Sequence, residues 1–173
     1  MSRQFVTEAV MMAIYGQLLL PDGPVTYIVP YTSVLELYEL QDSDEPLMNY
    51  PDDDQHVKGK IKELIRYFEE PLNKKKINRC LAVPWAKSAT ILLGGHAQLV
   101  IINSMDTAQY GELFDPIETE LLLTSQREKI PVLTDQFELI QRIIESGVPV
   151  QVYDIDDFDF ALEESTPSSL TDH

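Results

Sequence analysis

Acidic residues near the ends of predicted strands are the side chains of this sequence whose types and spacing could do chemistry. Hard cations such as Mg²⁺ and Mn²⁺ prefer oxygen ligands, and two such ions can clamp a phosphodiester for in-line attack by water. A nuclease site of that kind needs three or four acids from different elements at one edge of a sheet. By position, the catalytic candidates are Glu36, Glu39, Asp115, Glu118 and Asp135.

Within this set, Glu36, Glu118 and Asp135 are the predicted metal ligands. Mg²⁺ or Mn²⁺ is expected only if the protein is a nuclease, and no other cofactor is expected. The sequence contains neither the glycine-rich phosphate-binding motifs nor Gly-x-Ser-x-Gly or His-Glu-x-x-His. Cys80 and the three histidines do not have the spacing of zinc ligands.

Each acid also has a structural interpretation. Asp135 and Glu138 have the spacing of a capping box, which satisfies helix N-terminal amides without catalysis. Asp115 and Glu118 suit a helix N-terminus through its dipole, and Glu36 and Glu39 suit the solvated face of an amphipathic helix. Because the chain has 29 acids, several fall near strand ends by chance. The structural interpretation is therefore favoured for any single acid.

The elements that would position these acids are clearest over residues 115–154. This stretch predicts helix, strand, helix and strand, with acids at the strand exits. Two strands joined by a helix of this length imply a right-handed parallel crossover. Ligands of such sheets bind outside the carboxyl ends of the strands. The predicted elements are a helix over 116–129, a strand over 130–134, a helix over 136–146 ended by Gly147, and a strand over 148–153.

The rest of the chain predicts further helices and strands and one hairpin. Adjacent glycines, Gly94 and Gly95, supply the positive φ values that a tight hairpin turn requires. Together, all the predicted elements indicate a three-layer α/β/α sandwich with a mostly parallel mixed sheet and one β-hairpin over about residues 89–103. The expected elements are a helix over 4–19 (with a strand start at Phe5–Val6 as the alternative), a strand over 25–29, helices over 34–40 and 56–72, a strand over 77–83, and the hairpin arms 89–93 and 97–103.

A single α/β domain is expected over residues 1–162. Residues 41–56 are acidic, interrupted by prolines and long for a connection in a compact domain, so they predict a mobile loop. Residues 163–173 predict a disordered acidic tail.

The charge of the chain limits the classes of partner that it is expected to bind. The net charge is −16, but residues 58–87 hold nine of the thirteen basic residues against three acids, which leaves −22 for the remainder. An acidic body argues against binding DNA or an anionic membrane, and RNA is expected only through the basic segment 58–87. No apolar run reaches the length of a membrane span, Glu8 interrupts any signal peptide, and the single cysteine fits a reducing compartment. We therefore expect a cytoplasmic protein.

Two segments, residues 28–40 and 115–154, resemble a PIN domain, the fold of many toxin and RNA-processing nucleases. In the first, Pro30 ends a strand and the next helix carries an acid, Glu36 or Glu39. In the second, Glu118 stands at the acid of the family's Asp-x-x-Ile-Leu-x-x-Ala helix, and Thr134-Asp135 resembles its Thr-Asn-Asp segment. The resemblance implies a carboxylate site for metal ions.

The sequence departs from that family at two acids. Thr7 or Tyr31 stands where the family has the aspartate of its opening strand, and Gln136 replaces the acid of Thr-Asn-Asp. A carboxylate site that loses ligands holds its ions poorly. These departures imply a degenerate, non-catalytic relative.

Two strands are followed by Val-Pro-aromatic, ending at Tyr31 and at Trp85. The two corners predict that both aromatic residues lie on the same rim of the sheet, as a surface for a partner or ligand. The alternative is ordinary strand termination with an aromatic lid on the core.

The sequence as a whole favours a protein that acts by protein–protein interaction or regulation, without enzymatic activity, on a degenerate nuclease-like scaffold. Its partner is expected to be another protein or a second copy of the chain. The main alternative is a metal-dependent ribonuclease that uses the candidate acids. A further alternative is a small-molecule sensor that uses Tyr31 and Trp85.

Overall fold

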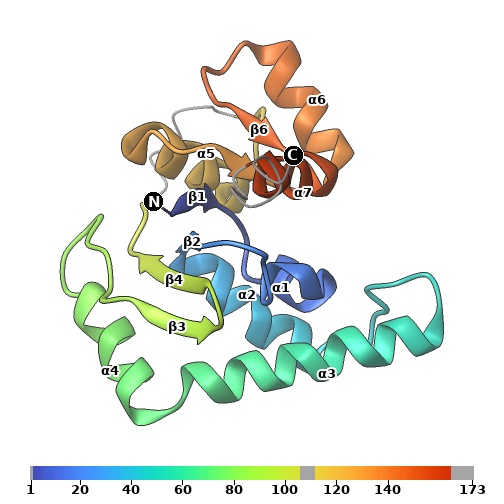
Figure 1. Ribbon diagram of the computed structural model, residues 1–173, viewed down its shortest axis with the longest axis vertical. Helices are drawn as coiled ribbons and strands as arrows, with labels where there is room; N and C mark the ends of the chain where they lie inside the picture. The colour runs from blue at the N-terminus through green and yellow to red at the C-terminus, as the bar shows by residue number, and fades with distance from the viewer. Residues whose placement is uncertain (1, 106–111, 165–173) are drawn as a thin grey trace, which may run out of the picture.

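The computed structural model describes residues 2–105 and 112–164, which form a sheet with helices packed on both of its faces (Figure 1). The strands are β1 (Arg3–Val6), β2 (Val25–Pro30), β3 (Ile91–Gly94), β4 (Ala97–Ile102), β5 (Val132–Leu133) and β6 (Val152–Tyr153). The helices are α1 (Val10–Ile14), the 3₁₀ turn η1 (Gly16–Leu18), α2 (Tyr31–Asp42), α3 (Pro51–Phe68), α4 (Pro71–Cys80), α5 (Pro116–Glu128), α6 (Phe137–Ser146) and α7 (Ile155–Glu164).

The strands pair in the order β3-β4-β2-β1-β5-β6, and each neighbouring pair is parallel except β3 with β4. That antiparallel pair is the predicted hairpin, and Gly94 and Gly95 at its turn have φ of 116° and 51°. A mostly parallel, mixed α/β sheet with one hairpin is thus confirmed.

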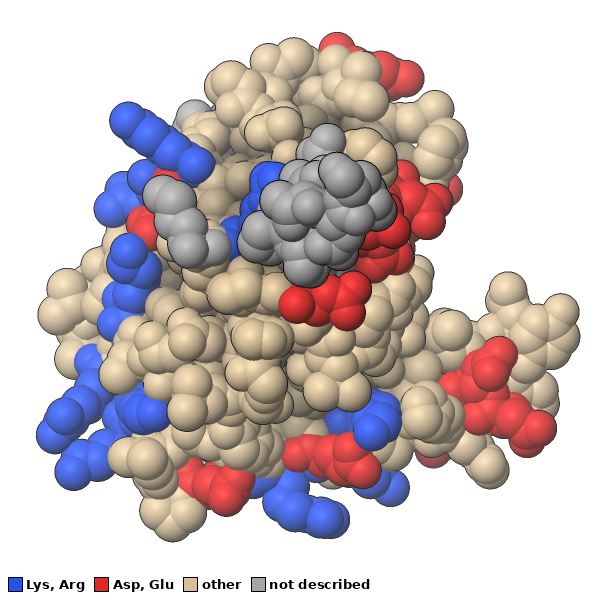
Figure 2. All heavy atoms as spheres, in the orientation of Figure 1, with Lys and Arg blue, Asp and Glu red and all other residues tan. Residues whose placement is uncertain are grey.

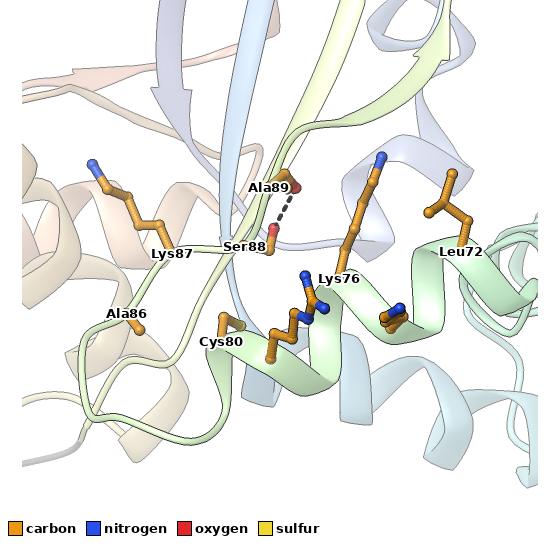
Figure 3. Close-up of a pocket in the computed structure, with 9 residues that line it drawn as sticks. Leu72, Lys76, Cys80, Ala86, Lys87, Ser88 and Ala89 are labelled. Atoms are coloured by element: carbon orange, nitrogen blue, oxygen red, sulfur yellow. Dashed lines mark hydrogen bonds between the residues drawn. The ribbon is translucent and has the colours of Figure 1, made fainter.

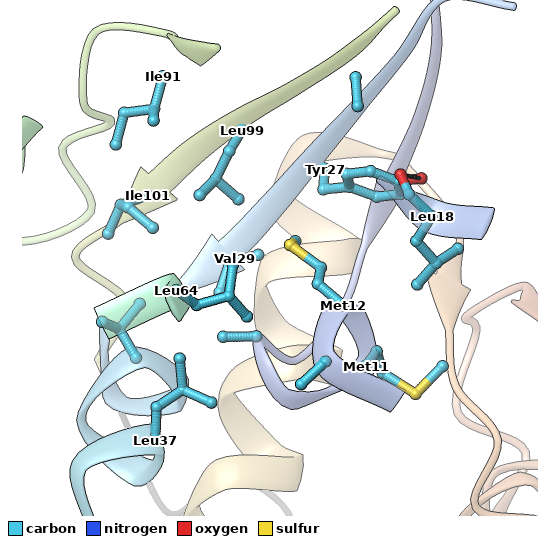
Figure 4. Packing of buried hydrophobic residues seen from close by; sticks show 14 of the residues in the cluster. Met11, Met12, Leu18, Tyr27, Val29, Leu37, Leu64, Ile91, Leu99 and Ile101 are labelled. Carbon is cyan, nitrogen blue, oxygen red and sulfur yellow. Dashed lines mark hydrogen bonds between the residues drawn. The ribbon is translucent and has the colours of Figure 1, made fainter. Parts of the chain in front are cut away.

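Alternate residues of the central strands face opposite layers. Phe5, Tyr27 and Leu99 belong to a large buried cluster that includes α1, α2 and α3. Their sequence neighbours Val6 and Ile28 belong to a second cluster with α5. Figure 4 shows the first of these clusters from close by. Because side chains alternate along a strand, the two clusters lie on the two faces of the sheet, one under α1–α3 and one under α5.

The first strand is the main departure from the predicted elements. The sequence predicts a helix over residues 4–19, whereas the structure has β1 followed by the short α1. β1 lies between β2 and β5, and its consecutive residues Phe5 and Val6 are both buried. A strand covered on both faces carries the same unbroken apolar pattern as a buried helix. The alternative strand start at Phe5–Val6 is the one that the structure adopts.

The predicted strand over residues 77–83 is wrong. These residues instead form the end of α4 and the turn after it. Ile77 and Cys80 are the buried side chains, three residues apart and therefore on one face of a helix. A short apolar run does not distinguish a buried strand from the end of a helix whose other residues are polar.

Part of the predicted mobile loop 41–56 is helical, because α3 begins at Pro51. Asp52, Asp53 and Asp54 occupy its first turn, where the helix dipole favours negative charge. The Asp54 carboxylate also accepts the backbone amide of Leu47 at 2.5 Å, which ties the preceding chain to the helix.

The C-terminal acids also belong to a helix, α7. Asp154 and Asp157 each accept the other's backbone amide, at 2.8 and 3.0 Å, and so cap its first turn. The predicted tail 163–173 thus begins within α7, and its residues 165–173 lie outside the described part. Within the described ranges, no helix is long and apolar enough to cross a membrane.

Candidate functional site

Glu8 lies where the order of the strands reverses. The chain leaves β1 at Val6, and β1 is flanked by β2 on one side and by the much later β5 on the other, where Val6 pairs with Val132. In open α/β sheets, ligands bind outside the carboxyl ends of the strands at such a switch point. Glu8 therefore occupies the place at which this topology puts a ligand.

Two buried hydrogen bonds fix the backbone on either side of Glu8. The Thr7 hydroxyl donates to the carbonyl of Leu133, at the end of β5, over 2.9 Å. The Ala9 amide donates to Ser33 Oγ, on α2, over 2.6 Å. Glu8 is therefore held between two elements that are distant in the sequence.

Glu8 is a mostly buried residue whose carboxyl has no protein partner among the described residues and whose oxygens keep contact with solvent. The residue is 7% exposed, and its side chain has no hydrogen bond or ion pair with any described residue. Burial, and after it the charges of Glu36, Asp115, Asp135 and Glu118, raises the pKa of Glu8 from 4.5 to about 8. Such a carboxyl costs free energy when it is ionised, and a bound proton or cation removes that cost.

Glu36 faces this group of acids from α2. It is half-buried, and burial, followed by the charges of Asp115 and Glu39, raises the pKa of its carboxyl. Glu39, one turn further along α2, is exposed. The structure thus brings Glu36 to the group and leaves Glu39 in solvent beside it.

Glu118 is as buried as Glu8 but fully paired. Both oxygens of its carboxylate accept hydrogen bonds from the Arg142 guanidinium on α6, at 2.7 Å each. With Asp115 it also forms the capping box of α5, at the helix N-terminus where the sequence places these two acids. Burial alone would raise the pKa of Glu118, but the bonds from Arg142 and from the Asp115 amide lower it overall.

Asp135 follows β5 and is exposed, and its carboxylate accepts the Tyr15 hydroxyl at 2.7 Å. The predicted capping box of Asp135 and Glu138 is wrong. The N-cap of α6 is Gln136, which makes no side-chain capping bond. Tyr15 comes from the segment between α1 and η1, so Asp135 links β5 to the N-terminal part of the chain.

Sequence reasoning missed two buried carboxylates, Glu8 and Glu120. Glu120 is 3% exposed and accepts the hydroxyls of Ser104 at 2.6 Å and of Thr32 at 3.0 Å. It thus ties α5 to the start of α2 and to the residues after β4. One sequence feature could have identified Glu8. If the apolar pair Phe5-Val6 is interpreted as the end of a strand, the polar residues Thr7-Glu8 that follow lie at the carboxyl edge of the sheet.

The aromatic pair does not share a cluster. Tyr31 packs against the large cluster with α1, α2 and α3. Trp85 packs against the cluster on the other face and lies under the Arg127 guanidinium, 4.2 Å from the centre of its ring. Trp85 also has a φ of 65°, an uncommon conformation for a bulky side chain.

The chemistry of the donor set fits a hard cation, because every candidate ligand around Glu8 is a carboxylate oxygen. Glu8, Glu36 and Asp135 would hold the ion, since Glu118 is occupied by Arg142. As the side chains stand, no three described Asp, Glu, His or Cys residues are grouped closely enough to hold a metal ion. The acids therefore share an electrostatic environment, and holding an ion would require their side chains to move closer together.

Comparison with known proteins does not extend this description: no protein-family model, no curated protein and no solved structure matches this chain.

Proposed function

We propose that the acidic edge around Glu8 binds a divalent cation and that the protein uses it to hydrolyse phosphodiester bonds of RNA. The observation that carries the proposal is Glu8 itself. The residue is 7% exposed, its carboxyl has no protein partner among the described residues although its oxygens reach solvent, and it lies near four other acids at the switch point of the sheet. An unpaired carboxyl in such a place destabilises the folded state, and the rest of the fold must supply the stability that offsets it. Such arrangements are typical of functional sites.

Each residue has a distinct part in this proposal. Glu8, Glu36 and Asp135 would hold the cation, which when bound stabilises negative charge on a phosphate and lowers the pKa of its own water. Since the pKa of Glu8 is about 8, this residue carries a proton at neutral pH and releases it when the ion binds. Tyr15 orients Asp135 through its hydroxyl. Arg142 neutralises Glu118 and so keeps the start of α5 beside the site without adding a further unpaired charge.

The resemblance of residues 28–40 and 115–154 to PIN domains supports RNA as the substrate. The sequence departs from that family at its opening aspartate, where Thr7 stands. Glu8 is the next residue and supplies a carboxyl directly after β1. That carboxyl would stand in for one of the two acids whose absence makes the sequence look degenerate; Gln136 stands at the other.

Thermal unfolding with and without Mn²⁺ tests the proposal. An ion that binds only the folded protein stabilises it by mass action, by about 2.7 kcal/mol at 100 times its Kd. Wild type should gain stability and should cleave a single-stranded RNA in the presence of Mn²⁺. Glu8→Gln, which keeps the shape of the side chain, should lose both effects.

The matched control is Glu145→Gln, the same change of charge at an exposed residue of α6. It should behave as wild type. Equal stabilisation of wild type and Glu8→Gln by Mn²⁺, or cleavage that persists in Glu8→Gln, would refute the site.

A regulatory interaction without catalysis is the second candidate function. Two of the three predicted metal ligands, Glu118 and Asp135, already have protein partners. The side chains of Phe137 and Ile144 on α6 are 69% and 72% exposed, which suits a surface for another protein. Under this candidate Mn²⁺ leaves the unfolding temperature unchanged, and Phe137→Ser with Ile144→Ser abolishes association with the partner or with a second copy of the chain.

A further inference from the structure

A basic pocket lies between α4 and the segment 86–89 that leads towards β3. It encloses about 330 Å³, and its polar wall consists of Lys75, Lys76, Arg79, Lys87 and Ser88. Figure 3 shows Leu72 and Lys76 on α4 across the pocket from Ser88 and Ala89. Leu72, Ala86 and Ala89, together with the buried Cys80, are its apolar lining residues.

The pocket concentrates positive charge in a strongly acidic protein. Four of its nine lining residues are cationic and none is acidic, although the net charge of the chain is −16. Figure 2 shows Lys and Arg side chains gathered on the side of the molecule where α4 lies in Figure 1. An anion at this place meets a local field opposite to that of the rest of the protein.

Three of the four cations have no acidic partner among the described residues. Lys76 donates to the carbonyl of Thr90 at 2.7 Å, and Lys87 pairs with Glu128 at 2.7 Å. Lys75 and Arg79 have no hydrogen bond or ion pair with any described residue. They stand four residues apart on α4, a spacing at which like charges destabilise a helix. An anion between them would relieve that repulsion.

The pocket adjoins the carboxyl edge of the sheet, the edge that holds Glu8. Lys87 bridges to Ile102, the last residue of β4, and β2 lies between β4 and β1. At the usual strand spacing, the backbone at Lys87 is roughly 15 Å from β1. This distance suits a chain of phosphates better than a single small anion.

We propose that this pocket binds the backbone phosphates of single-stranded RNA and so positions the substrate for the acidic edge. The inference rests on the proposed function for its substrate class, but RNA binding by the pocket requires no cation. Phosphate contacts of this kind are electrostatic and weaken with salt. The pocket would therefore supply affinity, and the acids around Glu8 would supply the chemistry.

Binding of a labelled single-stranded RNA in EDTA tests the pocket apart from the cation site. Fluorescence anisotropy gives the Kd, and the single tryptophan, Trp85, should change its emission because it adjoins Ala86 of the pocket. The double variant Lys75→Glu with Arg79→Glu should bind RNA ~10-fold more weakly at low salt. Both side chains are exposed, so the variant should fold.

The matched control is Lys62→Glu with Arg66→Glu. These two residues are also exposed, also four apart on one helix, and lie on α3 within the same basic segment 58–87. The control should lose less than about 3-fold, because it changes the net charge without touching the pocket. Equal losses in the two double variants would overturn the proposal, as would wild type that does not bind RNA in EDTA.

Three further measurements identify the ligand. RNA should bind more tightly than inorganic phosphate or polyglutamate; a match by phosphate would assign the pocket to small anions, and a match by polyglutamate to acidic proteins, and either result would overturn the proposal. If wild type binds RNA in EDTA while Mn²⁺ fails to stabilise it, the proposed function fails and the pocket stands.

Discussion

The end of β1 and the start of α5 each carry a buried glutamate. One of the two has a cationic partner and the other has none among the described residues. Glu8 is 7% exposed and Glu118 is 6% exposed. Arg142 and a capping box satisfy Glu118, and its pKa is lowered. Glu8 has no such partner among the described residues, and its pKa is raised to about 8. Burial alone therefore does not set the pKa of a glutamate in this fold; the presence or absence of a partner decides its direction.

The largest expected effect is the pH dependence of stability that Glu8 imposes. Its pKa is about 8 when folded and 4.5 ordinarily, so between these values the folded protein holds a proton that the unfolded chain lacks. The contribution of Glu8 to stability is then complete below about pH 4.5 and lost as the pH rises through 8. Glu8→Gln should remove this loss and raise the free energy of unfolding by about 3 kcal/mol at pH 8.5.

Urea unfolding of wild type and Glu8→Gln at pH 5 and at pH 8.5 measures this effect. The variant should gain stability over wild type only at the higher pH. A variant that is less stable than wild type at pH 8.5 would mean that Glu8 has a partner, as Glu118 has, and the comparison would collapse.

The other half of the comparison is tested by removing the partner of Glu118. Arg142→Met should leave a buried carboxylate without its cation and should destabilise the fold by about 2 kcal/mol, a value reduced because the Arg142 side chain is 38% exposed. The pKa of Glu118 should then rise towards that of Glu8. Carboxyl NMR titration checks the direction, and Arg127→Met, at an exposed arginine that stacks on Trp85, should cost less than about 1 kcal/mol.

A smaller effect concerns Asp135, which is one of the exposed acids of the group. Tyr15→Phe should remove its hydrogen bond and cost about 0.5–1 kcal/mol, because Asp135 can turn to water. The pKa of Tyr15 itself is raised to about 12, first by burial and then by Asp135, and absorbance titration should show it fall in Asp135→Asn. Tyr50→Phe, at a tyrosine that is 71% exposed, should change nothing.

The fold was largely readable from the sequence because its signals are local. Adjacent glycines predict the hairpin, and Asp115 with Glu118 predicts the start of α5; both features are where the sequence puts them. The central strand was not readable as such, because Phe5 and Val6 are buried on two faces and a buried helix has the same pattern. Glu8 was missed for that reason alone.

Less of the candidate site could be predicted from the sequence, because the contacts that define it join segments that are distant in the sequence. The sequence names Glu36, Glu118 and Asp135 as candidates, and their roles in binding or catalysis stay predictions. It does not show that Arg142 reaches Glu118 or that Tyr15 reaches Asp135, since those pairs are 24 and 120 residues apart. Which acid lacks a partner follows only from the packing.

Calorimetric titration of Mn²⁺ into wild type, in two buffers of different ionisation enthalpy at pH 7, tests the central claim most directly. The claim is that the cation replaces a proton on Glu8. Because Glu8 is protonated at this pH, wild type should release about one proton for each ion bound, and its affinity should rise between pH 6 and pH 8.5. Binding without proton release, with the same affinity at both pH values, or no binding, would contradict the account.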